Sequence, residues 1–164
     1  MTPEQKNSEL KKHKDIILAT IDYIIEGIEV GLTHDQFDTI VGYYQQQKQQ
    51  TEKYYQGNRL DRLQQRLYSL TEYLRRRSDL SFASYIKEKT GYYIDIYENV
   101  RRRVNTIIEQ NQIKNKKELD DVGIMLNVYK QHPVYQDKID ILKVLLIDFG
   151  KRTNKQRLSR DREG

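Results

Sequence analysis

Apolar residues recur at helical spacing along most of this chain. A first stripe, which predicts a helix that ends before Gly31, consists of Ile17, Ile21, Ile24, Ile25 and Ile28. Thr33 precedes Gln36 by three residues, and this capping-box pattern predicts the start of a second helix. The second helix is expected to continue through the polar stretch 45–56 and to end at Gly57-Asn58.

The third segment has the most regular pattern, with a leucine at alternating spacings of three and four residues. The leucine seam consists of Leu60, Leu63, Leu67, Leu70 and Leu74. Asn58 is expected to cap the start of this helix, and Arg75–Arg77 suit the negative end of its dipole. The seam covers only two heptads, so packing inside a bundle is favoured over a dimer seam, which stays the alternative.

The second half of the chain also contains residues that typically begin or end helices. Ser81 is expected to cap a short helix that Gly91 ends, and Asn115 with Glu118 has the spacing of another cap. Between them, a longer helix is expected to bury Ile96, Val100, Val104, Ile107 and Ile108. Pro133 suits the first turn of a last helix, which Gly150 is expected to stop. The apolar residues of that helix are Ile141, Leu142, Leu145, Leu146 and Phe149.

These patterns predict an all-α fold, an irregular bundle of six or seven helices around one core. No segment alternates strictly enough to predict a strand. We expect a single helical domain over residues 12–150, with a subdivision near 78–80 as the alternative. Residues 1–11 and 151–164 are expected to be flexible, mobile basic tails.

Composition narrows the classes of function. Of 164 residues none is Cys, which excludes disulfide frameworks and Cys-ligated metals. No apolar run approaches the length of a membrane span, and the polar N-terminus predicts no secretory signal, so we expect no membrane partner and a cytosolic location. The net charge is +5, but residues 151–164 alone carry six basic side chains against two acidic ones. The basicity therefore lies at the ends of the chain rather than in its body.

Catalytic patterns are lacking, and we expect neither an enzyme nor a cofactor or metal. The three histidines His13, His34 and His132 lie far apart, and phosphate-binding, nucleophile-elbow and zinc motifs are missing. The best carboxylate cluster is Asp22, Glu26 and Glu29 on one predicted helix face. Its interpretations are a cation or general-base site, a solvated helix face, and one half of an ion-pair set, whose partners would be Arg59, Arg62 and Arg66.

Thirteen tyrosines, several of them adjacent to one another, favour a protein partner, which could be a second copy of the chain. The predicted interaction surface consists of Tyr54, Tyr55, Arg59, Arg62 and Arg66. We therefore expect a non-enzymatic helical protein-binding protein, an interaction or adaptor protein. The alternative is a nucleic-acid-binding accessory protein whose contacts would be Arg75, Arg76, Arg77, Arg101, Arg102, Arg103, Arg157 and Arg160.

The alternative also includes a degenerate helix-turn-helix around residues 83–102. Gly91 would form the turn, and the second helix would begin near Tyr93 and Asp95. The motif normally has a small residue in the middle of its first helix, and Lys87 occupies that position here. Asp95 would repel the phosphates of a bound nucleic acid. The basic residues 101–103 would touch only the backbone of the nucleic acid.

Overall fold

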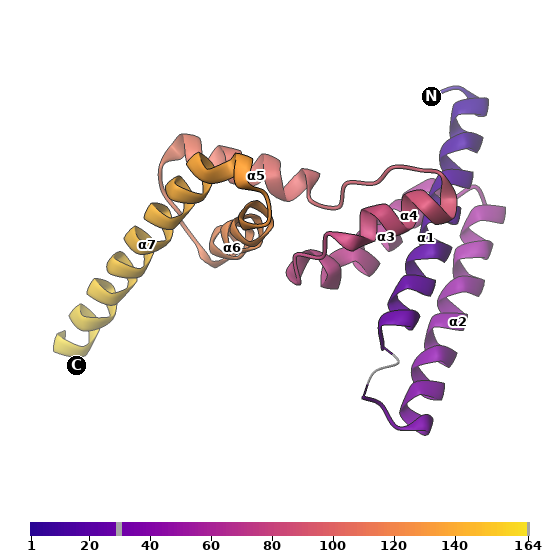
Figure 1. Ribbon diagram of the computed structural model, residues 1–164, viewed down its shortest axis with the longest axis horizontal. Helices are drawn as coiled ribbons and strands as arrows, with labels where there is room; N and C mark the ends of the chain where they lie inside the picture. Colours follow the sequence, from indigo (N-terminus) through magenta and orange to yellow (C-terminus); the bar gives the residue numbers. More distant parts are fainter. Residues whose placement is uncertain (29–30, 164) are drawn as a thin grey trace. The chain divides into compact units, whose positions relative to one another are not determined.

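The computed structural model describes residues 1–28 and 31–163, and all regular structure within them is helical (Figure 1). The all-α prediction is confirmed, and the described residues contain no strand. A 3-10 turn, η1 (Pro133–Tyr135), leads directly into the last helix. The α-helices are α1 (Pro3–Ile28), α2 (His34–Gln56), α3 (Leu60–Arg76), α4 (Ser81–Thr90), α5 (Glu98–Gln110), α6 (Lys116–Lys130) and α7 (Gln136–Glu163).

The helices form two compact units. Unit 1 comprises residues 1–74 and 79–96, and unit 2 comprises residues 75–78 and 97–164. Unit 1 therefore contains α1, α2, α4 and nearly all of α3, whereas unit 2 contains α5, α6, η1 and α7. The expectation that residues 12–150 behave as one domain stays a prediction.

In unit 1, α2 and α4 pack against α1. The isoleucine stripe of α1 supplies the buried Ile17 and Ile21, which form one cluster with Leu10 of α1 and Leu63 of α3. The other members of the leucine seam also pack inside unit 1, with Leu74 buried and Leu60, Leu67 and Leu70 half-buried. The structure thus uses the seam as part of the interior of unit 1.

In unit 2, α6 packs against both α5 and α7. The residues that α5 buries include Val104 and Ile107, and α6 contributes Val122 and Met125. Their exposed fractions are 2% or less, and Leu142 of α7 is fully buried as well. This interior fixes one face of α7 and leaves its other face outside.

Several predicted helix ends are confirmed. The Thr33 hydroxyl oxygen accepts from the amide of Gln36 at 3.3 Å, and the Gln36 side chain accepts from the Thr33 amide at 3.1 Å. The Asn115 side chain accepts from the Glu118 amide at 2.9 Å. Gly91 ends α4 at φ +75°, in the left-handed region that glycine adopts without strain.

Two predicted caps are wrong. Asn58 follows α2 in a left-handed conformation, φ 54°, and does not cap α3. Ser81 is the first residue of α4, not its cap, because the Asp79 carboxylate accepts from the amides of Ser81 at 2.9 Å and Phe82 at 3.0 Å. A carboxylate two residues upstream reaches those amides and also suits the positive end of the helix dipole.

The predicted tails are helical. Residues 3–11 belong to α1, and Leu10 is buried there at 2% exposure. Gly150 does not stop α7, which continues to Glu163, because the Lys, Arg and Gln residues that follow favour a helix and no proline interrupts it. Pro133 begins η1 rather than α7. Whether either end moves in solution stays a prediction.

Candidate interaction surface

Helix α7 carries apolar residues on two opposite faces. Ile139, Leu142 and Leu145 are buried, with exposed fractions of 6%, 0% and 2%. On the opposite side, Ile141, Val144 and Ile147 are 41%, 56% and 58% exposed. Successive residues of an α-helix are turned by about 100°, so the centres of the two sets lie on roughly opposite sides, and the sets adjoin where Ile141 lies one turn before Leu145.

The exposed set continues along the helix. Leu158, which is 59% exposed, lies eleven residues after Ile147 and therefore about three turns further on the same side. We call Ile141, Val144, Ile147 and Leu158 the α7 stripe. A helix that is apolar on all sides is normally covered on all sides, whereas a surface helix has one polar face. The stripe is thus an apolar face that the packing of unit 2 does not use.

Charged residues flank the stripe in a segregated order. Asp137 and Asp140 precede Val144 on the stripe side, and Lys151 and Lys155 follow Ile147 on that side. All four residues are exposed. Asp148, which directly follows Ile147, is also exposed on this side of α7. Apart from Asp148, the stripe is therefore acidic in its N-terminal half and basic in its C-terminal half.

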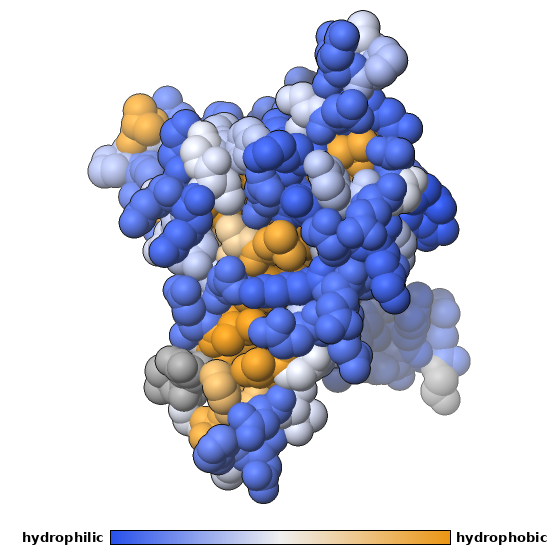
Figure 2. Space-filling model, turned by 90° about the vertical axis from the view of Figure 1, so that its right-hand side faces the viewer, coloured by the Kyte–Doolittle hydropathy of each residue, from blue (hydrophilic) through white to orange (hydrophobic). Residues whose placement is uncertain are grey.

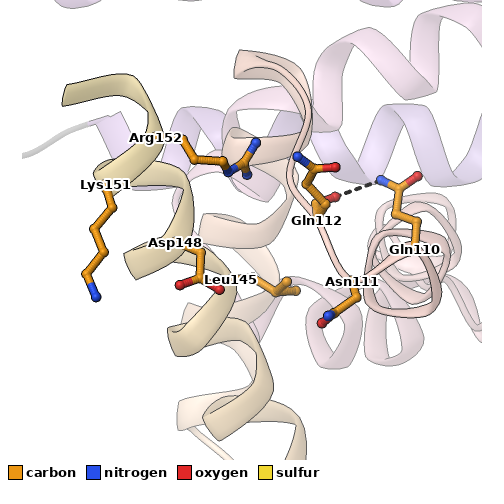
Figure 3. A pocket seen from close by; sticks show the side chains of 7 residues that line it. All are labelled: Gln110, Asn111, Gln112, Leu145, Asp148, Lys151 and Arg152. Carbon is orange, nitrogen blue, oxygen red and sulfur yellow. Dashed lines mark hydrogen bonds between the residues drawn. The ribbon is translucent and has the colours of Figure 1, made fainter. Parts of the chain in front are cut away.

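A shallow depression of about 360 Å³ lies where α7 meets the connection between α5 and α6 (Figure 3). Arg152 donates from its guanidinium to the backbone oxygen of Ile113 at 2.9 Å and holds the connection against α7. The residues that line the depression are Gln110, Asn111, Gln112, Leu145, Asp148, Lys151 and Arg152. Asp148 is the one carboxylate among them, so this lining does not provide an acid and base pair.

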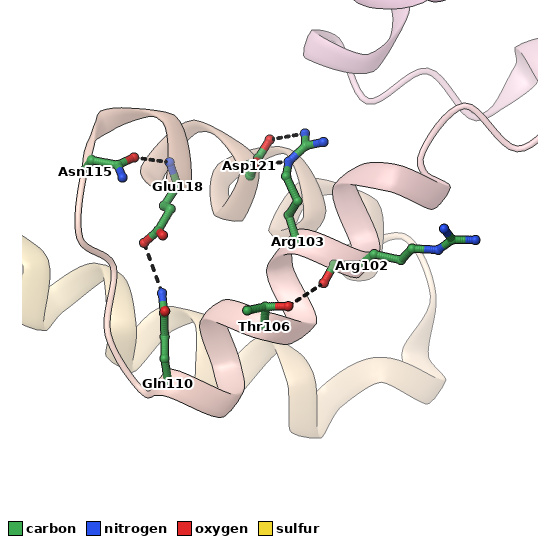
Figure 4. A network of polar contacts seen from close by, with 7 residues as sticks. All are labelled: Arg102, Arg103, Thr106, Gln110, Asn115, Glu118 and Asp121. Atoms are coloured by element: carbon green, nitrogen blue, oxygen red, sulfur yellow. Dashed lines mark hydrogen bonds and ion pairs between the residues drawn. The ribbon is translucent and has the colours of Figure 1, made fainter.

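A network of polar contacts joins α5 to α6 (Figure 4). Arg103 donates to the Asp121 carboxylate through Nε at 2.6 Å and Nη2 at 2.8 Å, and Asp121 is 6% exposed. Glu118 accepts from the Gln110 side chain at 3.2 Å and from the Lys114 amide at 2.7 Å. Arg103, a predicted nucleic-acid contact, is therefore engaged in an internal ion pair.

The other predicted nucleic-acid contacts in unit 2 occupy several different places. Arg102 is exposed and pairs with Glu98 on its own helix, whereas Arg101 is half-buried. Arg75, at the end of α3, is buried, and Arg76 and Arg77 are exposed. Arg157 and Arg160 are exposed on α7, on the side away from the stripe. The three arginines of α5 thus differ in exposure and in partners, and the two arginines of α7 belong to a different helix.

The predicted helix-turn-helix geometry is wrong. Helix α4 ends at Thr90 and α5 begins only at Glu98, so seven residues separate the two helices. The motif requires a turn of about three or four residues. Tyr93 and Asp95 lie in this connection and not at the start of the second helix.

The predicted interaction surface in unit 1 is partly exposed, since Arg59 and Arg62 are exposed and Arg66 is half-buried. Tyr54 and Tyr55 are half-buried and pack against the cluster around Ile17. Lys14 Nζ lies 4.2 Å from the centre of the Tyr55 ring, and the Arg66 guanidinium lies 5.2 Å from that of Tyr54. Arg66 also donates to Gln47, while Arg59 and Arg62 pair with Asp61.

The predicted ion-pair set between Asp22, Glu26, Glu29 and the three arginines is wrong for the residues that the structure describes. Asp22 pairs with Lys48 of α2 at 2.6 Å, and Glu26 accepts from the Tyr85 hydroxyl at 3.2 Å. Burial, and then the hydrogen bond to Glu26, raise the pKa of Tyr85 to about 12. Glu29 lies outside the described residues. Helix α1 therefore presents Asp22 to α2 and Glu26 to α4.

Apolar surface also occurs on unit 1. Figure 2 views the molecule from the side on which Figure 1 draws α1 and α2, and orange apolar side chains interrupt the blue surface there. Apolar residues of this helix pair, such as Ile24, Ile28, Phe37 and Val41, are half-buried. The members of the α7 stripe are more exposed than these side chains. The side chains of unit 1 that match the stripe in exposure include Tyr43, Tyr68 and Tyr73, whose hydroxyl groups are polar, so the stripe is the stronger candidate for an aliphatic binding face.

Residues 1–28 and 31–163 show neither a metal site nor a membrane span. No three His, Asp or Glu side chains in these ranges gather where they could hold a metal ion. None of the helices formed there is both long and apolar enough to cross a membrane.

Sequence reasoning missed the α7 stripe. It grouped Ile141 with Leu142 and Leu145 as apolar residues of the last helix, did not separate buried from exposed positions, and gave Val144 and Ile147 no separate role. The signal was present in the spacing of three residues from Ile141 to Val144 and from Val144 to Ile147, which runs beside the buried set. A helix that is covered on two faces carries two such sets of apolar residues, one for each face.

Comparison with known proteins assigns no family to this chain. No family model, curated protein or solved structure matches it.

Proposed function

We propose that this chain is a non-enzymatic protein that binds another protein through the α7 stripe. The observation that carries the proposal is the exposure of Ile141, Val144 and Ile147 on the face of α7 opposite its buried face. A singly exposed apolar residue needs no explanation, but a contiguous apolar face rimmed by polar residues marks an interaction site. The proposed setting is the cytosol, which the cysteine-free composition favours.

The energetics favour a covered stripe. Full burial of a fully exposed Val, Leu or Ile side chain is worth about 1.5–3 kcal/mol, and the stripe residues, which are 41–59% exposed, gain roughly half of that when a partner covers them. The α7 backbone is already fixed by its contacts with α6, so a partner meets an ordered helix. A preformed face reduces the entropy that binding must overcome.

Site-specific photo-crosslinking in extracts of the cells that produce the chain tests this function. We expect a photoreactive residue at Ile147 to form an adduct with a specific protein. The adduct should disappear when Val144→Lys is added, because a charge then occupies the centre of the face. A photoreactive residue at Arg160, which is exposed on the other side of α7, is the matched control.

The result must hold for a folded chain and an identified partner. Far-ultraviolet dichroism should show unchanged helicity for Val144→Lys, since Val144 is 56% exposed. The identified partner should bind the purified wild-type chain and not Val144→Lys. Equal crosslinking from positions 147 and 160, or none from 147, overturns the proposal.

The basic end of α7, residues 151–163, supports nucleic-acid binding as a second candidate function. Its cations stand on an exposed helix and, apart from Arg152, project from all sides of it. Phosphate contacts release counterions, so such binding weakens steeply as salt rises. Arg157→Ala with Arg160→Ala should then lower both the affinity for DNA or RNA and its salt dependence. A complete lack of retention at low salt in a filter-binding assay excludes this candidate.

A further inference from the structure

We infer that the partner of the α7 stripe is a second copy of the chain, bound with the two α7 helices antiparallel. This inference rests on the proposed function, namely that the stripe binds a protein. It is argued from the order of apolar and charged residues along the exposed face. Along the face the order is acidic, apolar and basic, so two antiparallel copies place acidic groups opposite basic groups and apolar groups opposite each other. A two-fold symmetric interface requires a surface that is complementary to itself in this way.

The apolar centre sets the register of the pair. Val144 and Ile147 are the central exposed residues of the stripe, at 56% and 58% exposure. In an antiparallel pair, Val144 of each copy can lie opposite Ile147 of the other copy. The same register then determines which charged side chains meet.

The charges are placed almost symmetrically about this centre. Asp140 lies four residues before Val144, and Lys151 lies four residues after Ile147. Asp137 lies seven residues before Val144, and Lys155 lies eight after Ile147. Antiparallel pairing therefore brings Asp140 against Lys151 and Asp137 against Lys155 of the other copy.

The directions of these residues around the helix agree with this pairing. At about 100° per residue, Asp140 and Lys151 point within about 20° of each other along the middle of the stripe, and Asp137 and Lys155 share one direction about 50° to one side. Residues that point in the same direction relative to the contact face each other across an antiparallel helix pair. A parallel pair in the same register would place acid against acid and base against base, which is repulsive.

Exposed apolar residues extend the match to both ends of the contact. Val134 of η1 is 82% exposed and lies ten residues before Val144. Leu158 is 59% exposed and lies eleven residues after Ile147. The same register brings Val134 of one copy towards Leu158 of the other, which gives a partner to two apolar side chains that unit 2 leaves outside.

A charge-swap experiment on the full chain tests the inference. One variant, Asp137→Lys with Asp140→Lys, makes the N-terminal half of the exposed face basic. The other, Lys151→Glu with Lys155→Glu, makes its C-terminal half acidic. The matched control, Arg157→Glu with Arg160→Glu, lowers the charge by four units, as the second variant does, on the side of α7 away from the stripe.

Sedimentation equilibrium measures the outcome. We expect the wild type and the control to form dimers at about 100 µM or below, and each swapped variant alone to dimerise at least about tenfold more weakly. An equal mixture of the two swapped variants should restore a mixed dimer, because every charged contact is then again between opposite signs. A monomeric wild type, a mixture that stays monomeric, or a control that dissociates equally overturns the inference.

Cysteine crosslinking tests the register independently. Because the chain contains no Cys, Val144→Cys and Ile147→Cys each introduce one thiol. Under mild oxidation, a mixture of these two variants should form the mixed disulfide faster than either variant forms its own. Faster formation of the two symmetric disulfides contradicts the antiparallel register.

The failure of this inference can be separated from that of the proposed function. If the wild type is a monomer but a different protein crosslinks to position 147, the second-copy inference is wrong and the proposed function stands. If position 147 crosslinks to no chain, or only within its own chain, both are wrong. Dichroism of each variant shows whether a lost dimer reflects a lost fold.

Discussion

Arg103 of α5 and Asp121 of α6 form a two-point ion pair, with donor to acceptor distances of 2.6 Å and 2.8 Å. The Asp121 side chain is 9% exposed, and that of Arg103 is 37% exposed. A guanidinium and a carboxylate match each other in two parallel hydrogen bonds, which fixes both distance and orientation. This pair joins the two helices through Arg103, which the sequence had suggested as a contact for nucleic-acid phosphates.

Loss of the Asp121 carboxylate should destabilise unit 2. Asp121→Ala removes the acceptor of two hydrogen bonds from a partly buried guanidinium, so we expect a fall of about 1–3 kcal/mol in the free energy of unfolding. Asp120→Ala is the matched control, because Asp120 forms a pair with Lys116 that is exposed on both sides. That exposed pair should contribute only about 0–1 kcal/mol. Urea denaturation measures both variants, and equal effects would show that the buried pair has no special role.

The start of α4 offers a second comparison between neighbours. Asp79 accepts two backbone amides there and also the Tyr23 hydroxyl, at 2.9 Å and 3.1 Å. Asp79→Ala removes these acceptors and should lower the free energy of unfolding by about 1–3 kcal/mol. Ser81→Ala should change it by less than about 0.5 kcal/mol, because the Ser81 side chain does not cap the helix. Thermal unfolding in which Ser81→Ala is the more damaging variant would restore Ser81 as the cap.

Local signals in the sequence predicted most of the fold. The capping box of Thr33 and Gln36, the Asn115 cap and the leucine seam depend on residues a few positions apart, and the structure confirms the two caps and places the seam inside unit 1. The errors arose where a distant or stronger group took over. Asp79 rather than Ser81 caps α4, and Lys48 rather than an arginine of α3 pairs with Asp22. Gly150 lies inside α7 and does not end it. Spacing along one segment does not identify the side chain that another segment supplies.

The candidate site was harder to predict for a related reason. A helical wheel of α7 shows apolar residues on most sides, but it does not show which side faces α6. Only packing separates the buried Leu142 from the exposed Val144. The arginines gave the opposite error, because a run of charges in sequence, such as 101–103, turns around the helix and reaches different surroundings.

The high pKa of Tyr85 predicts a pH dependence of stability. Burial and the hydrogen bond to Glu26 favour the protonated phenol in the folded state and raise its pKa to about 12 from 10.0. Below pH 10 both states keep the proton, and this residue adds no pH dependence. Between about pH 10 and 12 the unfolded chain loses the proton first, so stability falls as pH rises. Tyr85→Phe should make that fall shallower in denaturation at a series of pH values, and an unchanged slope would contradict the assignment.

Two glycines should respond in opposite ways to alanine, which tests the continuity of α7. Gly150 lies inside the helix, and a Cβ added there meets no atom within 4 Å. Alanine loses less conformational freedom than glycine on folding, so Gly150→Ala should raise the free energy of unfolding by about 0.5–1 kcal/mol. At Gly91, with φ +75°, a Cβ is strained by the backbone itself, and Gly91→Ala should lower the free energy of unfolding by about 1 kcal/mol or more. Had Gly150 been the stop that the sequence suggested, its substitution would resemble that of Gly91. Urea denaturation of both variants therefore decides the matter: destabilisation by Gly150→Ala would mean that α7 ends there in solution and that Leu158 and the basic residues beyond it do not continue the exposed face.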